Sequence, residues 1–152
     1  MPAEKSSDKY IARLAGNLRK LNDYGKEKGV RINIEVINHY EVNIFVTAQE
    51  TVDFIEKYDL DNCYVHLDAY HMQLEELDPV EAIRTAKDHL GYFHIADSTR
   101  WYPGSGQMDL IEILETLEKV GYDGYVTVEC FCHGDGYQTA EKAIKYLKNI
   151  MK

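Results

Sequence analysis

Cysteine is scarce in this 152-residue sequence, and no long apolar run occurs anywhere in it. The three cysteines, Cys63, Cys130 and Cys132, are too few for a disulfide framework, and we interpret them as buried structural thiols in a reducing compartment. No apolar run approaches the roughly 18 residues that cross a membrane. The polar first ten residues also lack the apolar core of a secretion signal. These absences predict a cytoplasmic protein with no membrane partner.

The sequence also has fewer basic than acidic residues. Lysine and arginine together number 17 and aspartate and glutamate 26, so the formal net charge is −9. Nucleic acids and anionic membranes favour basic surfaces, so this balance argues against both as partners. The hydrophobic share of 45% is ordinary for a globular protein, and the length suits one domain with one core. We therefore expect residues 1–152 to form a single domain, since no linker or low-complexity segment divides them.

Helical and extended patterns alternate along the whole chain. Apolar residues at helical spacing predict helices that begin near Tyr10, at the capping box after Thr47, after the Asp78-Pro79 pair, near Met108 and near Ala140. Short extended runs lie between them, at residues 31–37, 63–68, 92–97 and 125–131. This alternation predicts an α/β fold with four parallel strands. The irregular stretch 98–107 is a candidate functional loop.

One face of each predicted strand carries an ionisable residue near its carboxyl end. Side chains alternate faces along a strand, so Glu35, Asp68, His94 and Glu129 fall opposite the apolar residues that face the helices. Sites in α/β barrels and open sheets lie at this end of the strands. Either each group is satisfied separately by backbone or solvent, or the four converge on one ligand. Three carboxylates and one imidazole suit a divalent cation of the Mn²⁺, Mg²⁺ or Co²⁺ type better than a structural zinc ion.

Four segments of the sequence resemble the ketose 3-epimerases, a group that includes the D-tagatose and D-psicose 3-epimerases. They are IEVINHYE at 34–41, LDAYHM at 67–72, FHIADSTR at 93–100 and VECF at 128–131. That group belongs to the xylose isomerase-like TIM-barrel superfamily of sugar isomerases and epimerases. The resemblance runs from about Tyr10 to the end of the chain, and each step between the four ionisable residues is about one βα unit long.

The resemblance implies a metal centre and an acid/base pair. Glu35, Asp68, His94 and Glu129 would be the metal ligands, with Mn²⁺ the expected cation. Glu35 and Glu129 would also be the catalytic acid and base on opposite faces of a ketose. The C2 carbonyl acidifies the proton on C3, so one glutamate would remove that proton and the other would return one to the opposite face. The implied reaction is C3 epimerisation through an enediolate.

Three further residues are implied to bind the sugar. His71 and Arg100 would hold oxygens near C1–C3, and Glu41 would bind the ketose end. Taken without the resemblance, His71 reads equally well as a surface histidine, and Arg100 as a solvated loop charge.

The length departs from that of a whole barrel. A (β/α)₈ barrel takes about 250 residues, whereas this sequence has 152 and four predicted strands. By resemblance these are the last four strands, so we expect half of a (β/α)₈ TIM barrel, either a fragment or a natural half-barrel. An open sheet exposes its inner face, here with Tyr64, Tyr92, Tyr125 and Phe131. We therefore expect a homodimer or a higher homo-oligomer.

Three functions are compatible with these patterns. The first is a metal-dependent sugar epimerase or isomerase, with activity impaired if the other half of the barrel is needed. The second is a non-catalytic half-barrel that binds metal and a carbohydrate or a partner protein. The third is a metal-dependent phosphodiesterase, which the net charge of −9 and the few spare histidines disfavour.

Overall fold

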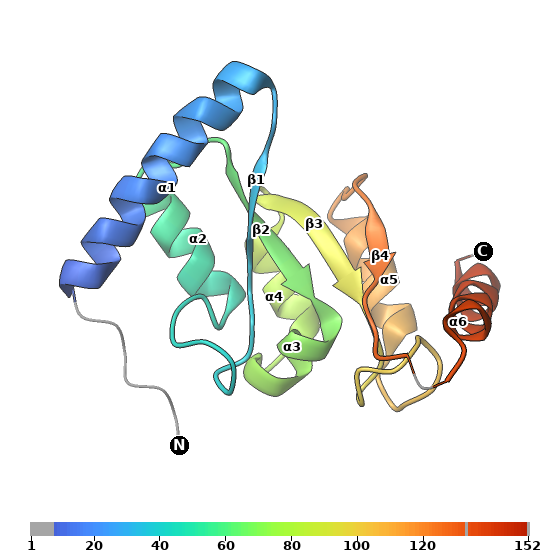
Figure 1. Ribbon diagram of the computed structural model, residues 1–152. Helices are drawn as coiled ribbons and strands as arrows, with labels where there is room; N and C mark the ends of the chain where they lie inside the picture. The colour runs from blue at the N-terminus through green and yellow to red at the C-terminus, as the bar shows by residue number, and fades with distance from the viewer. Residues whose placement is uncertain (1–7, 133, 152) are drawn as a thin grey trace.

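The computed structural model describes residues 8–132 and 134–151, which form an α/β fold around one parallel sheet (Figure 1). The sheet has four strands in the order β1-β2-β3-β4, so neighbours in sequence are also neighbours in space. The strands are β1 (Ile32–Glu35), β2 (Cys63–Asp68), β3 (Leu90–Ile95) and β4 (Val126–Val128). The helices are α1 (Asp8–Lys28), α2 (Ala48–Lys57), α3 (Ala69–Glu75), α4 (Pro79–Ala86), α5 (Leu110–Lys119) and α6 (Gly136–Ile150). The predicted fold class is therefore confirmed.

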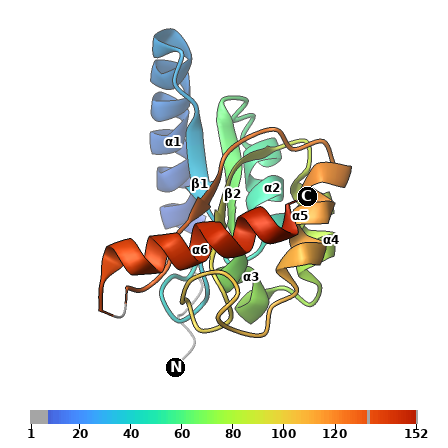
Figure 2. The same cartoon turned by 90° about the vertical axis from the view of Figure 1, so that its right-hand side faces the viewer.

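Helices cover one face of the sheet and leave the other open. Figure 2 shows α2, α4 and α5 on the same side of the strands. The strand residues that point toward them include the fully buried Val65, Leu67, Phe93 and Ile95. The opposite face has no helical layer among the described residues, and Tyr125 on it is 80% exposed. The core therefore lies between the sheet and the helices, and the ionisable strand ends lie on the open side.

Local capping explains where several helices begin. The hydroxyl of Thr47 accepts a hydrogen bond from the backbone N–H of Glu50, at 3.2 Å, at the start of α2. Asp78 caps α4 and is followed by proline in the first turn. Both starts were predicted from sequence, because a capping side chain satisfies amide donors that the first turn leaves free. Gly29 follows α1 with φ at 67°, in the left-handed region that glycine adopts without a steric penalty, and this conformation ends the helix.

Helix α3 was not predicted. Residues 69–75 follow β2 without a connecting loop, because Asp68 ends the strand and also caps the helix. Its carboxylate accepts hydrogen bonds from the N–H groups of Tyr70 and His71. Strands β1 and β4 are shorter than the predicted runs 31–37 and 125–131, β2 matches 63–68, and β3 begins two residues before the predicted run 92–97.

Two expectations about individual side chains need correction. Cys63 is buried as predicted, but Cys130 is only half-buried and Cys132 is exposed, because both follow β4 on the way to α6. Tyr125 and Phe131 are exposed as expected for an open inner face, whereas Tyr64 is half-buried beneath the guanidinium of Arg31.

The aromatic inner face is therefore less exposed than the strand pattern predicts. Tyr92 is half-buried too, with its hydroxyl 2.6 Å from the Thr127 hydroxyl.

Among the described residues, no helix has both the length and the apolar character needed to cross a membrane.

Candidate metal and substrate site

The four ionisable residues at the strand ends lie together in the structure. Glu35 ends β1, Asp68 ends β2, His94 lies next to the end of β3, and Glu129 follows β4 directly. Nδ1 of His94 is 3.5 Å from Oε1 of Glu35, 3.7 Å from Oδ2 of Asp68 and 3.6 Å from Oε2 of Glu129. Each residue offers one ligand atom, and these atoms all lie within 4.8 Å of one another. We call this group the tetrad.

Two atoms of the tetrad are buried without a hydrogen-bond partner among the described residues. They are Oδ2 of Asp68 and Nδ1 of His94. Oδ1 of Asp68 is used in capping α3, so its second oxygen is the one left over. Buried polar atoms are rarely left unpaired, because desolvation without a hydrogen bond is costly. Both atoms belong to the predicted ligand set, so the tetrad fits a divalent cation with oxygen and imidazole ligands.

Charge and burial shift the pKa values of the tetrad in opposite directions. The nearby imidazole of His94 lowers the pKa of Glu35. Burial raises the pKa of Asp68, whose side chain has no exposed surface. Burial works to lower the pKa of His94, but the adjacent Glu35 and Glu129 outweigh it and the pKa is raised. Excess negative charge around one imidazole is the electrostatic environment that a bound cation would neutralise.

Arg100 connects this group to the predicted substrate residues. Its guanidinium lies 2.8 Å from Oε2 of Glu129 and 3.5 Å from Oε1 of Glu41. Burial opposes ionisation of Glu129, but the hydrogen bond and charge of Arg100 prevail and its pKa is lowered. The arginine side chain is 17% exposed and packs over the ring of Tyr70, so it is not a solvated loop charge.

The backbone holds Arg100 in an uncommon conformation. Its φ is 59°, in the left-handed region that non-glycine residues seldom adopt. Its carbonyl accepts a hydrogen bond from the N–H of Phe131, at 2.7 Å, and its own N–H donates to the carbonyl of Asp97. The loop after β3 is thereby tied to the segment that follows Glu129.

Asp97 organises that loop, a role that the sequence did not reveal. Its carboxylate accepts hydrogen bonds from the N–H groups of Ser98, Gly104 and Met108. Burial alone would raise the pKa of Asp97. These hydrogen bonds, with one from Gly106, outweigh burial, so the pKa lies below its ordinary value. A Cβ added at Gly106 would lie 2.2 Å from the carboxylate, which explains glycine there. One buried side chain thus fixes the predicted functional loop.

His71 is buried beside the tetrad. It is only 1% exposed, so the reading of it as a surface histidine is wrong. Its Nδ1 lies 2.7 Å from the side-chain nitrogen Nδ2 of Asn38. The same Nδ2 also donates a hydrogen bond to Oε1 of Glu41, at 2.9 Å. Asn38, which the sequence analysis missed, therefore joins two of the three predicted substrate residues.

His66 is a second residue that the sequence analysis did not single out. The strand pattern placed it on the same face as Asp68, but it belongs to none of the segments that carry the resemblance. Its ring packs edge-on against His94 with the ring centres 4.1 Å apart. Burial, and then the charge of His94, lower its pKa to about 4.

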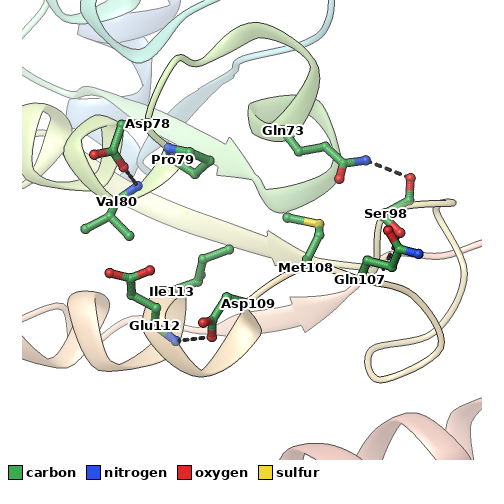
Figure 3. Close-up of a pocket in the computed structure, with 10 residues that line it drawn as sticks. All are labelled: Gln73, Asp78, Pro79, Val80, Ser98, Gln107, Met108, Asp109, Glu112 and Ile113. Atoms are coloured by element: carbon green, nitrogen blue, oxygen red, sulfur yellow. Dashed lines mark hydrogen bonds between the residues drawn. The ribbon is translucent and has the colours of Figure 1, made fainter.

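A separate cavity of about 400 Å³ lies between the starts of α4 and α5 (Figure 3). Asp78 and Asp109, which line it, cap those two helices. No tetrad residue lines this cavity, so it is distinct from the metal and substrate site. Its lining residues are Gln73, Asp78, Pro79, Val80, Ser98, Gln107, Met108, Asp109, Glu112 and Ile113.

The sheet is parallel, and acidic and imidazole side chains cluster at the carboxyl ends of its strands. These two features are typical of proteins built on an α/β barrel, whose sites lie at that end of the strands. The model of the xylose isomerase-like TIM barrel family matches residues 2–150, and the chain belongs to that family. The expected superfamily is therefore confirmed.

Relatives of this chain include proteins named as ketose 3-epimerases. The chain is 39% identical over 114 residues to an L-ribulose 3-epimerase of Methylomonas sp. (strain DH-1), covering 75% of this chain and 40% of that protein. It is 35% identical over 128 residues to a D-psicose 3-epimerase of Enterocloster bolteae, covering 84% of this chain and 42% of that protein.

Solved structures give the same grouping. A D-allulose 3-epimerase from Methylomonas sp., solved in complex with D-allulose, superposes with a TM-score of 0.91 at 31% identity. The match covers 98% of this chain and 58% of that structure. The sequence matches described above span about two fifths of the length of those curated relatives, which agrees with a partial barrel.

Proposed function

We propose that this chain provides the metal-binding and proton-transferring side of a ketose 3-epimerase. The observation that carries the proposal is the placement of Glu35 and Glu129. Glu35 ends the edge strand β1 and Glu129 follows the edge strand β4, and each has a carboxylate oxygen within 3.6 Å of Nδ1 of His94. The similarity to ketose 3-epimerases supports C3 of a ketose as the reacting centre.

The two glutamates perform the proton transfers in this proposal. One carboxylate takes the proton from C3, and the other delivers a proton to the opposite face, which inverts that carbon. A divalent cation, when bound, acts as a Lewis acid that increases the acidity of the C3 proton. Arg100 holds Glu129 by a 2.8 Å hydrogen bond and favours its ionised form, which suits it to act as the base.

The proposed ligand set is Glu35, Asp68, His94 and Glu129. Carboxylates suit Mn²⁺ and Mg²⁺, and one imidazole is also compatible with Co²⁺. Mn²⁺ is the cation that we propose for this site, and the buried Oδ2 of Asp68 and Nδ1 of His94, which have no hydrogen-bond partner among the described residues, support it.

The proposed substrate is a small ketose sugar. Arg100, His71 and Glu41 are the residues proposed to bind its oxygens, since their polar groups are linked to one another beside the tetrad. D-psicose and L-ribulose are the first sugars to test, because similar epimerases are named for them. Cytoplasmic location remains a prediction.

Self-association is part of the proposal. The inner face of the sheet has no covering helix among the described residues, and Tyr125 and Phe131, which come just before and after β4, are 80% and 57% exposed. A second copy of the chain, as a homodimer or a higher homo-oligomer, would shield these rings from water.

Hydrogen exchange at C3 tests this function directly. The protein, loaded with Mn²⁺, is incubated in D₂O with D-psicose or L-ribulose, and deuterium at C3 is measured by NMR. We expect exchange in the wild type and a loss of about 10²–10⁴-fold in Glu129→Gln, which keeps a ligating oxygen but accepts no proton. Absence of exchange with metal bound would contradict the proposal and support a non-catalytic half-barrel.

A further inference from the structure

His66 lies beside the tetrad in the strand register. It pairs with Glu35 across β1 and β2 and with Tyr92 across β2 and β3, while Asp68 pairs with His94. Because side chains alternate faces, His66 and Asp68 point to the same side of the sheet. His66 therefore lies two residue pairs before the Asp68–His94 pair, on the face that carries the candidate metal site.

The imidazole of His66 has an unused ligand atom. The residue is 8% exposed, and its Nε2 is buried without a hydrogen-bond partner among the described residues. The ring is packed edge-on against both Tyr92 and His94, which fixes its orientation. With Glu35 and His94 it forms a three-residue group whose ligand atoms all lie within 4.8 Å of one another, whereas Asp68 and Glu129 group with the same two residues without His66. An unpaired, immobilised nitrogen at that distance from two candidate ligands indicates a metal-binding role.

We propose that His66, Glu35 and His94 form a second ligand set that overlaps the tetrad, and that the His66 nitrogen raises the affinity of the site for Co²⁺ relative to Mn²⁺. This inference builds on the proposed metal centre but not on any particular reaction. Carboxylates alone suit Mn²⁺ and Mg²⁺, whereas imidazole favours later first-row cations. A centre that uses both His66 and His94 has two nitrogen ligands in place of the single one in the tetrad.

Metal affinities of the wild type and of His66→Leu test the proposal. Calorimetric titration of the metal-free protein with Co²⁺ and with Mn²⁺ gives two dissociation constants for each variant. We expect His66→Leu to weaken Co²⁺ binding by about tenfold or more, in the range seen when groups around a metal site are removed, and Mn²⁺ binding much less. The visible absorption of bound Co²⁺ should change as well, because a nitrogen ligand is lost.

Two controls separate ligation from folding. His89→Leu removes a histidine at the opposite end of β3, where it lies near Glu56, and should leave both affinities unchanged. Metal-free His66→Leu should melt at or above the wild-type temperature, since it removes an unpaired buried nitrogen. If leucine lowers that temperature, His66→Met repeats the titrations.

Equal loss of affinity for both cations, no loss, or no binding to the wild type would each overturn the inference. Failure of the proposed reaction is distinguishable from these results, since it would appear as metal binding that depends on His66 without deuterium exchange at C3.

Discussion

Arg100 contacts both a candidate metal ligand, Glu129, and another proposed substrate residue, Glu41. It lies 2.8 Å from Glu129 and 3.5 Å from Glu41, and it is mostly buried. Replacing it by alanine removes a cation that would bind substrate oxygens in both the ground state and the transition state. An interaction of that kind changes KM more than kcat.

We therefore expect Arg100→Ala to raise the KM for a ketose by about tenfold, equivalent to about 1.4 kcal/mol of binding. Steady-state kinetics with D-psicose measure both constants. Arg84→Ala is a matched control, because Arg84 lies on α4 and pairs with the exposed Glu81. A fall in kcat with KM unchanged would instead assign Arg100 to the chemical step.

Single residues differ in how well the sequence reveals them. The tetrad was predictable because each member has the same place in a strand, one that alternation and the strand ends define. His71 and Glu41 depended on the resemblance. Asn38, His66 and Asp97 were missed, since each matters only through neighbours that come close on folding. The roles of all these residues remain predictions, whereas their positions are now described.

At the scale of elements, the loop between β3 and α5 depends on one buried carboxylate. Asp97 accepts hydrogen bonds from the backbone of Ser98, Gly104 and Met108. In Asp97→Asn, an amide NH₂ would face some of these N–H donors. We expect a loss of about 1–3 kcal/mol in the free energy of unfolding, measured by urea denaturation. Asp88→Asn, on the exposed surface, should change it little.

Acid should remove this contribution. The folded pKa of Asp97 is below its ordinary value of 3.8, so the stabilisation is fully present above that value. It is lost as the pH falls through the lower folded pKa. The stability difference between wild type and Asp97→Asn should therefore shrink only below about pH 4. A difference that already disappears near neutral pH would show that another group is responsible.

The alternation of helices and strands could be predicted from the sequence, with the exception of helix α3, which has a local cause. Capping residues and apolar spacing marked α2, α4 and α5, because those helices start after loops. Helix α3 starts directly from a strand, and its cap, Asp68, is also a candidate metal ligand. A residue that serves two purposes gives no separate signal for the helix.

At the scale of the whole molecule, the open inner face determines the expected assembly. Tyr125 and Phe131 are largely exposed there, although Tyr64 and Tyr92 are only half-exposed. We expect light scattering at micromolar concentration to give a mass of at least twice the chain mass of 17.6 kDa. Tyr125→Lys should shift the protein toward monomer, and Tyr10→Lys, on α1, should not. A wild-type mass of 17.6 kDa would contradict the association.

The central claim is that four strand-end side chains form one metal centre, and thermal unfolding with Mn²⁺ tests it most directly. A ligand that binds only the folded state adds about 2.7 kcal/mol at a hundredfold excess over Kd, so the melting temperature should rise. Asp68→Asn is the matched variant, because asparagine caps a helix as well as aspartate does but lacks the carboxylate charge. We predict a clear rise in the wild type and a much smaller one in Asp68→Asn, whose amide keeps a ligating oxygen but not the negative charge. No rise in the wild type with Mn²⁺, Mg²⁺ or Co²⁺, or the same rise in both proteins, would contradict the account.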